Sequence, residues 1–433
     1  MLVSLDVETK CGQGCTEACE HALDPNRNEI TIIGASWIDQ YKEETAVFRS
    51  IEELNKFLAH LRNPELLGFN FKFDFRTLAN KGANIQLDQW KHDASLMASV
   101  YTRKVDPDYV AAYEAQRVLL NKNLPKGKGH RRTSGGSLKI LAPYFLGVEP
   151  FWEATTDHNN EEYVTKDAVY TYRLFSFLQQ KMIEEGSYTF YSSRFMDWVK
   201  LLVKMEQRGV KLDFDLMERQ EVKAALGAED AKNTLDFLWK DAYKAFNHLE
   251  IDKLKSEYKE MADKAYERSK DKSDIAKTRI TGRYNKLFEK AALSVAQSLN
   301  LDSPVQLKWL LKEYLKLDVT DFHDEESTGK PVLKKLANEG REDIKALLDY
   351  REQRKLLTAF FPSYKEMAYN GAIHCSFNAA STRTGRLSSS SPNLQQVPRG
   401  LHGLFIARPG YKFIIRDQAA IEPRLIAHAS DDP

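Results

Sequence analysis

Two acidic residues near the start of the chain could form half of a divalent-metal site. The stretch LVSLDVET at residues 2–9 places Asp6 and Glu8 two positions apart. Because side chains alternate between the faces of a β-strand, this spacing predicts both carboxylates on one face and the apolar side chains between them on the other. A D-x-E pair alone is common by chance, so its meaning depends on what else the sequence offers.

Two later stretches add further acidic residues. GFNFKFDF at residues 68–75 predicts a helix that Asn70 caps and that carries Asp74 in its first turn. In EEYVTKDAVYTYRLF, which starts at Glu161, Tyr163 and Asp167 are four residues apart and share one helical face. Strands and helices of these kinds must therefore bring the acidic residues together if they act as one site.

Four carboxylates in one place repel one another unless cations neutralise them. The set Asp6, Glu8, Asp74 and Asp167 therefore implies two divalent metal ions rather than a purely structural cluster. Such ions, about 4 Å apart, activate a water for attack on a phosphodiester and stabilise the leaving 3′ oxygen. The hydroxyl of Tyr163 is suited to position that water.

The order of these motifs resembles the 3′-to-5′ proofreading exonuclease domain of family A DNA polymerases. The matching elements are Asp6 with Glu8, G-x-N-x-K-x-D at 68–74 and Y-x-x-x-D at 163–167. The resemblance implies a ribonuclease H-like exonuclease domain that acts on single-stranded 3′ ends of DNA. It implies two Mg²⁺ ions per exonuclease site, with Mn²⁺ as a substitute, and catalytic roles for Asp6, Glu8, Asp74, Tyr163 and Asp167.

A cationic loop precedes the third motif. Residues 121–136 contain several basic residues and no acidic one, which alone is more typical of a solvated surface than of a nucleic-acid contact. However, SLKILAPYFLG at 137–147 resembles the segment before the third exonuclease motif in the same family. That resemblance places the loop beside the incoming single strand and implies DNA contacts for Asn70, Lys128, Arg131 and Arg132.

The Ser-rich stretch STRTGRLSSSSPNLQQVPRG at 381–400 suits a DNA backbone and minor groove. Arg386 can reach base-edge acceptors, and polar side chains around it can donate to bases or phosphates. Read alone, the stretch is only a loop. It closely resembles the family A segment that binds the primer-template near the growing end, which implies contacts from Thr384, Arg386, Asn393 and Gln395.

The segment FIIRDQAAIEPRLIAH at 413–428 resembles the first catalytic motif of the polymerase palm. The resemblance implies that Asp417 is a metal ligand at the end of a β-strand and that the backbone carbonyl of Gln418 is a further ligand. Glu422 matches the residue that favours deoxyribonucleotides. Pro423 departs from the family pattern but is tolerable in the first turn of a helix. Phe413–Ile415 is expected to form an exposed apolar edge.

The pattern of elements predicts a multidomain protein of mixed α+β and α/β class. Residues 1–190 alternate strands and helices, residues 191–370 are almost wholly helical, and β-type and turn chemistry returns at 371–433. By resemblance these are an exonuclease domain, a helical thumb and the N-terminal part of a palm. The basic stretch 270–286 would then lie in the thumb and contact the phosphates of a DNA duplex.

By this resemblance, the chain is the N-terminal portion of a DNA polymerase, which is a nucleotidyltransferase that acts in DNA replication. The same portion carries a 3′-to-5′ exonuclease. The sequence stops soon after Asp417, so we expect this chain to degrade 3′ ends but not to polymerise without a second chain that carries fingers and the rest of the palm. Three explanations stay open: a natural split, a truncation, and a polymerase half that survives only as a DNA-holding platform. The alternatives are a stand-alone exonuclease of the ribonuclease D type and a non-catalytic DNA-binding or assembly subunit.

Composition narrows the remaining classes. The 433 residues suffice for two or three domains, and the net charge of +1 means that any basic surface is local. No apolar run approaches the ~18 residues of a membrane span and no signal peptide is visible, so we expect a cytoplasmic protein, in the host cytoplasm if a phage encodes it. Cys11, Cys15, Cys19 and His21 have spacing that could bind zinc, although a loop of reduced thiols is the favoured interpretation.

Overall fold

The computed structural model divides the chain into two compact units. One unit comprises Met1–Leu212 and Met367–Pro433, and the other comprises Asp213–Glu366. The structure describes residues 1–11, 24–102, 137–148, 161–293, 299–321, 324–382 and 384–431. The predicted cationic loop with Lys128, Arg131 and Arg132 lies outside these ranges, as do the side chains of the four residues with zinc-like spacing. The predicted domain boundaries near 190 and 370 stay predictions.

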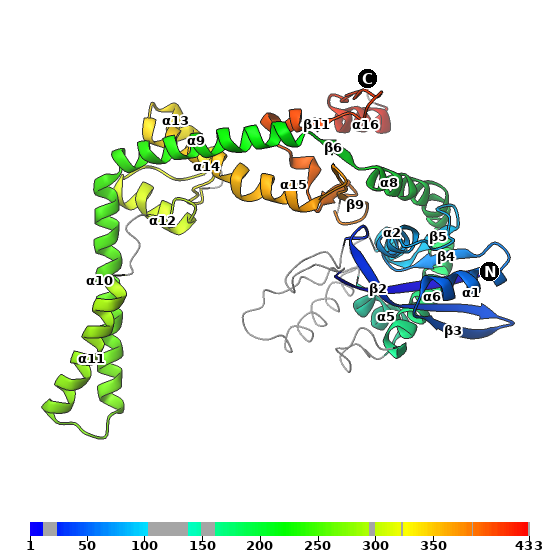
Figure 1. Ribbon diagram of the computed structural model, residues 1–433, viewed down its shortest axis with the longest axis horizontal. Helices are drawn as coiled ribbons and strands as arrows, with labels where there is room; N and C mark the ends of the chain where they lie inside the picture. The colour runs from blue at the N-terminus through cyan, green and yellow to red at the C-terminus, as the bar shows by residue number, and fades with distance from the viewer. Residues whose placement is uncertain are drawn as a thin grey trace. The chain divides into compact units, whose positions relative to one another are not determined.

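A five-stranded sheet forms the base of the first unit (Figure 1). Its strand order is β3-β2-β1-β4-β5, in which β1 pairs antiparallel with β2 and parallel with β4. The strand predicted from the alternation at residues 2–9 is confirmed as β1. The five strands are β1 (Leu2–Cys11), β2 (Asn28–Asp39), β3 (Lys42–Phe48), β4 (Glu65–Gly68) and β5 (Trp90–Asp93).

Helices pack on this sheet through an apolar core. α6 contacts β1, β2, β3 and β4, and α3 and α5 pack in turn against α6. The core includes Leu5, Phe71, Trp90 and Met97, each at most 1% exposed. The helices of this part are α1 (Ile51–His60), α2 (Lys72–Asn80), α3 (Ala94–Tyr101), α5 (Leu138–Leu146), α6 (Glu161–Glu184), α7 (Tyr188–Phe190) and α8 (Met196–Arg208), with a π-helical turn at η3 (Tyr191–Phe195).

The rest of the first unit consists of short strands and turns. A four-stranded sheet has the order β11-β6-β8-β7, and β9 pairs with β10 in a two-stranded ribbon. The elements are β6 (Val210–Leu212), β7 (Ala368–Tyr369), β8 (Ala372–Ile373), β9 (Ser376–Asn378), β10 (Ser388–Ser390), η6 (Leu394–Gln396), η7 (Arg399–Leu404), β11 (Phe405–Ile406) and α16 (Ile421–Ser430).

The second unit is helical, as the sequence predicts. α9 packs along α14, and α10 pairs with α11 as two adjacent helices (Figure 1). A second core around Trp239, Leu310 and Leu347 holds the other helices together. The elements are α9 (Phe214–Leu238), α10 (Lys240–Arg268), α11 (Asp274–Ala292), α12 (Pro304–Lys308), η4 (Trp309–Tyr314), α13 (Lys330–Asn338), α14 (Glu342–Lys355), η5 (Leu356–Phe360) and α15 (Phe361–Met367).

Two local predictions are wrong. Asn70 does not cap α2: its φ is +54°, whereas an N-cap residue has extended backbone, and α2 follows Phe71 with no side-chain cap. Residues 413–418 form no strand, so Asp417 does not end one, because no described strand pairs with this segment. The predicted exposure of the apolar run is confirmed, with Phe413 54%, Ile414 94% and Ile415 93% exposed.

Pro423 does fall in the first turn of α16, as predicted. Within the described parts of the chain, no helix combines the length and the apolar character that crossing a membrane would require.

Candidate functional site

β1 presents the first two carboxylates as its alternation predicts. Leu5 and Val7 are buried on the core side, whereas Asp6 and Glu8 are only partly buried. The ladder between β1 and β2 shifts register just after Glu8, between Glu8 and Thr9. The two acidic side chains therefore lie on one face of β1, just before an irregularity in its ladder with β2.

Gly34 allows α6 to reach this face. It pairs with Asp6 across the sheet, and a Cβ atom added to it would lie 2.5 Å from the carbonyl oxygen of Val164. Any side chain at this position would therefore push the first turn of α6 away from the sheet. That turn carries Tyr163, and the next carries Asp167, so the glycine brings both to the carboxylates of β1.

Asp74 lies in the first turn of α2, and Asp93 fixes where that helix begins. The buried carboxylate of Asp93 accepts hydrogen bonds from the backbone amides of Asn70 at 3.1 Å and Phe71 at 2.8 Å. It also caps α3 by accepting from the amides of Ser95 and Leu96. Sequence analysis missed Asp93, which lies 23 residues after Asn70. Its carboxylate accepts hydrogen bonds at the start of α2, the role that was predicted for the Asn70 side chain.

Electrostatics shows that the four predicted carboxylates come together. Burial raises the pKa of Asp6 well above its ordinary range, and the charges of Asp167, Asp74 and Glu8 raise it further. Burial and Asp167 raise the pKa of Glu8 to about 7. Burial also raises the pKa of Asp74, with added contributions from Glu8 and Asp93. The structure thus gathers residues from β1, α2 and α6 into one acidic cluster.

Tyr163 and a lysine that sequence analysis did not assign to this place complete the cluster. Burial, followed by the charges of Asp167, Glu8 and Asp6, raises the pKa of the Tyr163 hydroxyl, so the group stays protonated. The Nζ atom of Lys139 on α5 lies 5.5 Å from the centre of the Tyr163 ring. Its charge lowers the pKa of both Asp6 and Glu8.

The donor chemistry of this cluster fits a hard divalent cation such as Mg²⁺. All four acidic ligands offer carboxylate oxygens, and Oδ2 of Asp6 is buried without a hydrogen-bond partner. Among the residues that the structure describes, however, no three His, Cys, Asp or Glu side chains are grouped closely enough to hold a metal ion together. The carboxylates are therefore near one another but not closed into a finished coordination shell.

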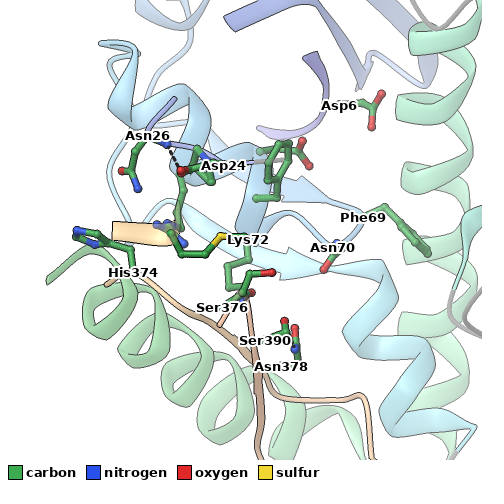
Figure 2. Close-up of a pocket in the computed structure, with 16 residues that line it drawn as sticks. Asp6, Asp24, Asn26, Phe69, Asn70, Lys72, His374, Ser376, Asn378 and Ser390 are labelled. Carbon is green, nitrogen blue, oxygen red and sulfur yellow. Dashed lines mark hydrogen bonds between the residues drawn. The ribbon is translucent and has the colours of Figure 1, made fainter. Parts of the chain in front are cut away.

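A cavity of about 440 Å³ opens beside the cluster (Figure 2). Asp6 and Asp74 contribute to its wall, together with Lys72 of α2. The opposite part of the wall comes from the ribbon β9–β10 and its flanks, through Ser376, Asn378, Ser390 and Ser391. The cavity thus connects the acidic cluster with the strand pair that borders residues 381–400.

Residues 381–400 form a turn held by its own side chains. β9 pairs with β10 in antiparallel register, from Ser388 opposite Asn378 to Ser390 opposite Ser376. The Nε2 atom of Gln395 donates to the carbonyl of Leu387 at 3.1 Å. The side chains predicted to contact DNA are all exposed: Thr384, Arg386, Asn393 and Gln395.

The polymerase-like residues do not form a comparable cluster. Asp417 and Gln418 lie on an exposed segment without regular structure. Glu422, on α16, forms an ion pair with Arg386, so these two predicted residues are brought together. Because both side chains are more than 60% exposed, this pair contributes little to stability.

Sequence comparison relates the chain to polymerases. The family model described as DNA polymerase family A matches residues 270–433. DNA polymerase I of Borreliella burgdorferi is 24% identical over 86% of this chain and 33% of its own length. DNA polymerase I of Pseudomonas aeruginosa is 36% identical over 34% of this chain and 17% of its own length. The chain thus spans at most about a third of these two relatives.

Structural comparison gives the same relation at the level of the fold. A structure titled as the POL domain of Pol1 from M. smegmatis in complex with DNA primer-template and dNTP matches with a TM-score of 0.65. The match covers 99% of this chain and 59% of that chain at 18% sequence identity. In its sequence and in its fold, the chain is thus similar to family A DNA polymerases of the DNA polymerase I type.

Proposed function

We propose that this chain removes nucleotides from the 3′ ends of DNA and forms part of a replicative family A polymerase. The observation that carries the proposal is the acidic cluster: the charges of Asp167, Asp74 and Glu8 raise the pKa of Asp6, and those of Asp167, Glu8 and Asp6 raise the pKa of Tyr163. A cluster of this kind costs folding free energy unless it binds cations, which favours a catalytic role over a structural one.

The fold supports the nuclease assignment. Three antiparallel strands continue into two parallel ones, in the order β3-β2-β1-β4-β5, and α6 crosses the sheet with the third motif. The central strand carries the first motif, and α2 follows β4 with the second. We therefore assign residues 1–190 to a ribonuclease H-like exonuclease domain.

Each residue has a defined task in this proposal. The four carboxylates would hold two Mg²⁺ or Mn²⁺ ions, which when bound would lower the pKa of a water and offset charge at the phosphate. The protonated hydroxyl of Tyr163 orients the attacking water by hydrogen bonding. Lys139, anchored over the Tyr163 ring, opposes the excess negative charge of the site.

DNA is the partner that the remaining surfaces suit. We assign the exposed polar side chains of residues 381–400 to primer-template binding; the similar POL domain from M. smegmatis is in complex with a DNA primer-template. On α11, one face carries four basic residues at helical spacing beside a shallow cavity: Arg279, Arg283, Lys286 and Lys290. Such a row of cations suits the phosphates of a duplex in a thumb.

Nucleotide addition needs more than these segments provide. Asp417 lies on an exposed, irregular segment, and Glu422 is held by Arg386. Phosphoryl transfer needs several convergent carboxylates and cations around the triphosphate. We propose that Asp417 and the backbone of Gln418 contribute to such a site once a second chain or segment supplies fingers and the rest of the palm.

The double substitution Asp6→Ala/Glu8→Ala tests the nuclease proposal. Wild-type protein with Mg²⁺ should shorten a 5′-labelled single strand from its 3′ end, and the double variant should lose this activity by at least about 1,000-fold. The matched control Glu44→Ala/Glu52→Ala removes the same charge from β3 and α1, away from the cluster, and should remain active. Persisting degradation by the double variant would refute the proposal.

A further inference from the structure

A fully buried glutamate lies between the acidic cluster and the ribbon β9–β10. The side chain of Glu206, on α8, has no exposed surface, and its carboxylate forms ion pairs with two basic side chains. Nζ of Lys72 lies 2.6 Å from Oε1, and NH1 of Arg76 lies 2.8 Å from Oε2. A buried carboxylate is costly unless it is paired, so these contacts strongly restrict where Lys72 and Arg76 can go.

Both basic side chains belong to α2, the helix that carries Asp74. Lys72 and Arg76 are one helical turn apart and share a face, while Asp74 lies about 200° around the axis from Lys72. Glu206 therefore holds one side of α2, and the opposite side presents Asp74 to Asp6 and Glu8. A rotation of α2 about its axis would break the ion pairs and withdraw Asp74 from the cluster at the same time.

The same carboxylate also holds β9. The backbone amide of Phe377 donates to Oε1 of Glu206 at 2.6 Å, and Nζ of Lys72 donates to the hydroxyl of Ser376 at 2.9 Å. β9 pairs with β10, which lies inside residues 381–400. One buried side chain thus fixes both the helix with Asp74 and the ribbon that leads to the proposed primer-template segment.

We propose that Glu206 is a positioning residue that couples the setting of Asp74 to the placement of the ribbon β9–β10. The inference rests on the proposed nuclease function. If DNA binding at 381–400 displaces the ribbon, we expect Glu206 to move with it and to shift α2, and therefore Asp74, through its ion pairs with Lys72 and Arg76. Glu206 itself touches no reacting atom in this proposal.

The substitution Glu206→Gln tests the coupling because it keeps the shape and removes the charge. We expect Mn²⁺ affinity, measured by titration calorimetry or by electron paramagnetic resonance, to fall 10- to 100-fold. Hydrogen exchange should accelerate in α2 and β9 together. The matched control is Asp343→Asn, which disturbs another buried acid, paired with Arg341 and Trp239 in the second unit, and should change neither result.

A double-mutant cycle separates coupling from general loosening. If Glu206 acts through Asp74, Glu206→Gln should change Mn²⁺ affinity less than twofold in an Asp74→Asn background. An equal loss in both backgrounds, or unchanged exchange of α2 in Glu206→Gln, would overturn the inference. Should that variant not fold, Lys72→Met leaves Glu206 paired with Arg76 and should shift both measurements in the same directions by a smaller amount.

The two proposals fail in different ways. Wild-type protein that binds Mn²⁺ without degrading DNA would refute the nuclease proposal and leave the coupling standing. Active wild-type protein whose Glu206→Gln variant binds Mn²⁺ with unchanged affinity would refute the coupling and leave the nuclease proposal standing.

Discussion

Replacing Glu8 with glutamine should stabilise the metal-free protein while it removes function. The folded chain holds Glu8 partly buried beside Asp167, which raises its pKa from the ordinary 4.5 to about 7. The unfolded chain releases this proton at lower pH than the folded chain. Ionisation of Glu8 therefore favours unfolding. The stability that the protonated form of Glu8 contributes is fully present below pH 4.5 and is lost as the pH rises through 7.

The size of this effect follows from the pKa difference. A change from 4.5 to about 7 corresponds to about 3 kcal/mol at full ionisation, because each pKa unit is worth 1.36 kcal/mol. Water around the partly exposed carboxylate reduces this to about 2–3 kcal/mol. Glu8→Gln also relieves the repulsion that Glu8 exerts on Asp6 and Asp74, which acts in the same direction.

Urea unfolding in the presence of EDTA measures this difference. Wild type and Glu8→Gln should have similar free energies of unfolding near pH 4.5, and the variant should be about 2–3 kcal/mol more stable at pH 8. Mg²⁺ should narrow the difference by stabilising the wild type, and Glu52→Gln, on the exposed side of α1, should match the wild type throughout. A difference that does not change with pH, or a variant less stable at pH 8, would refute the electrostatic argument.

Two further predictions concern residues behind the cluster. His92 packs against Phe175 and Tyr191 with Nδ1 buried and unpartnered, and burial lowers its pKa from 6.5 to about 4. Because the unfolded chain takes up this proton first, the free energy of unfolding of the wild type should fall by about 2–3 kcal/mol relative to His92→Phe as the pH falls from 6.5 to 4. Urea unfolding measures this, and a difference that does not change with pH would contradict the prediction. Asp93→Asn leaves at least one of the backbone amides that donate to Asp93 without an acceptor, so the free energy of unfolding should fall by about 1–3 kcal/mol. Exonuclease activity should fall as well, because the start of α2 is held less firmly. Full activity of the variant would show that Asp93 does not position Asp74.

The sequence predicted the residues of the acidic cluster because each lies on a regular element. Alternation along β1 places Asp6 with Glu8, and a spacing of four on α6 places Tyr163 with Asp167, without any knowledge of the rest of the fold. The structure agrees with these local patterns. That the three elements converge rests on long-range packing, which the motif order suggested only through resemblance to a known family.

The residues that sequence analysis missed act across the fold. Asp93 caps a turn 23 residues earlier in the chain, Lys139 reaches the cluster from α5, and Glu206 binds α2 from α8. No periodicity connects these residues with the motifs they support. The predicted strand at 413–415 failed for a related reason, since a strand needs a neighbour to satisfy its backbone and none of the described strands pairs with it.

The arrangement of charge explains why these supporting residues are needed. Carboxylates that repel one another separate unless the backbone that carries them is held in place. In the metal site that we propose, ion pairs between these carboxylates and basic side chains would compete with the metal ions. The structure places its compensating contacts one layer back, where Asp93 receives amide donors and Glu206 receives the two cations of α2. The four carboxylates thereby stay available for the metal ions that we propose they bind, while the elements that carry them remain fixed.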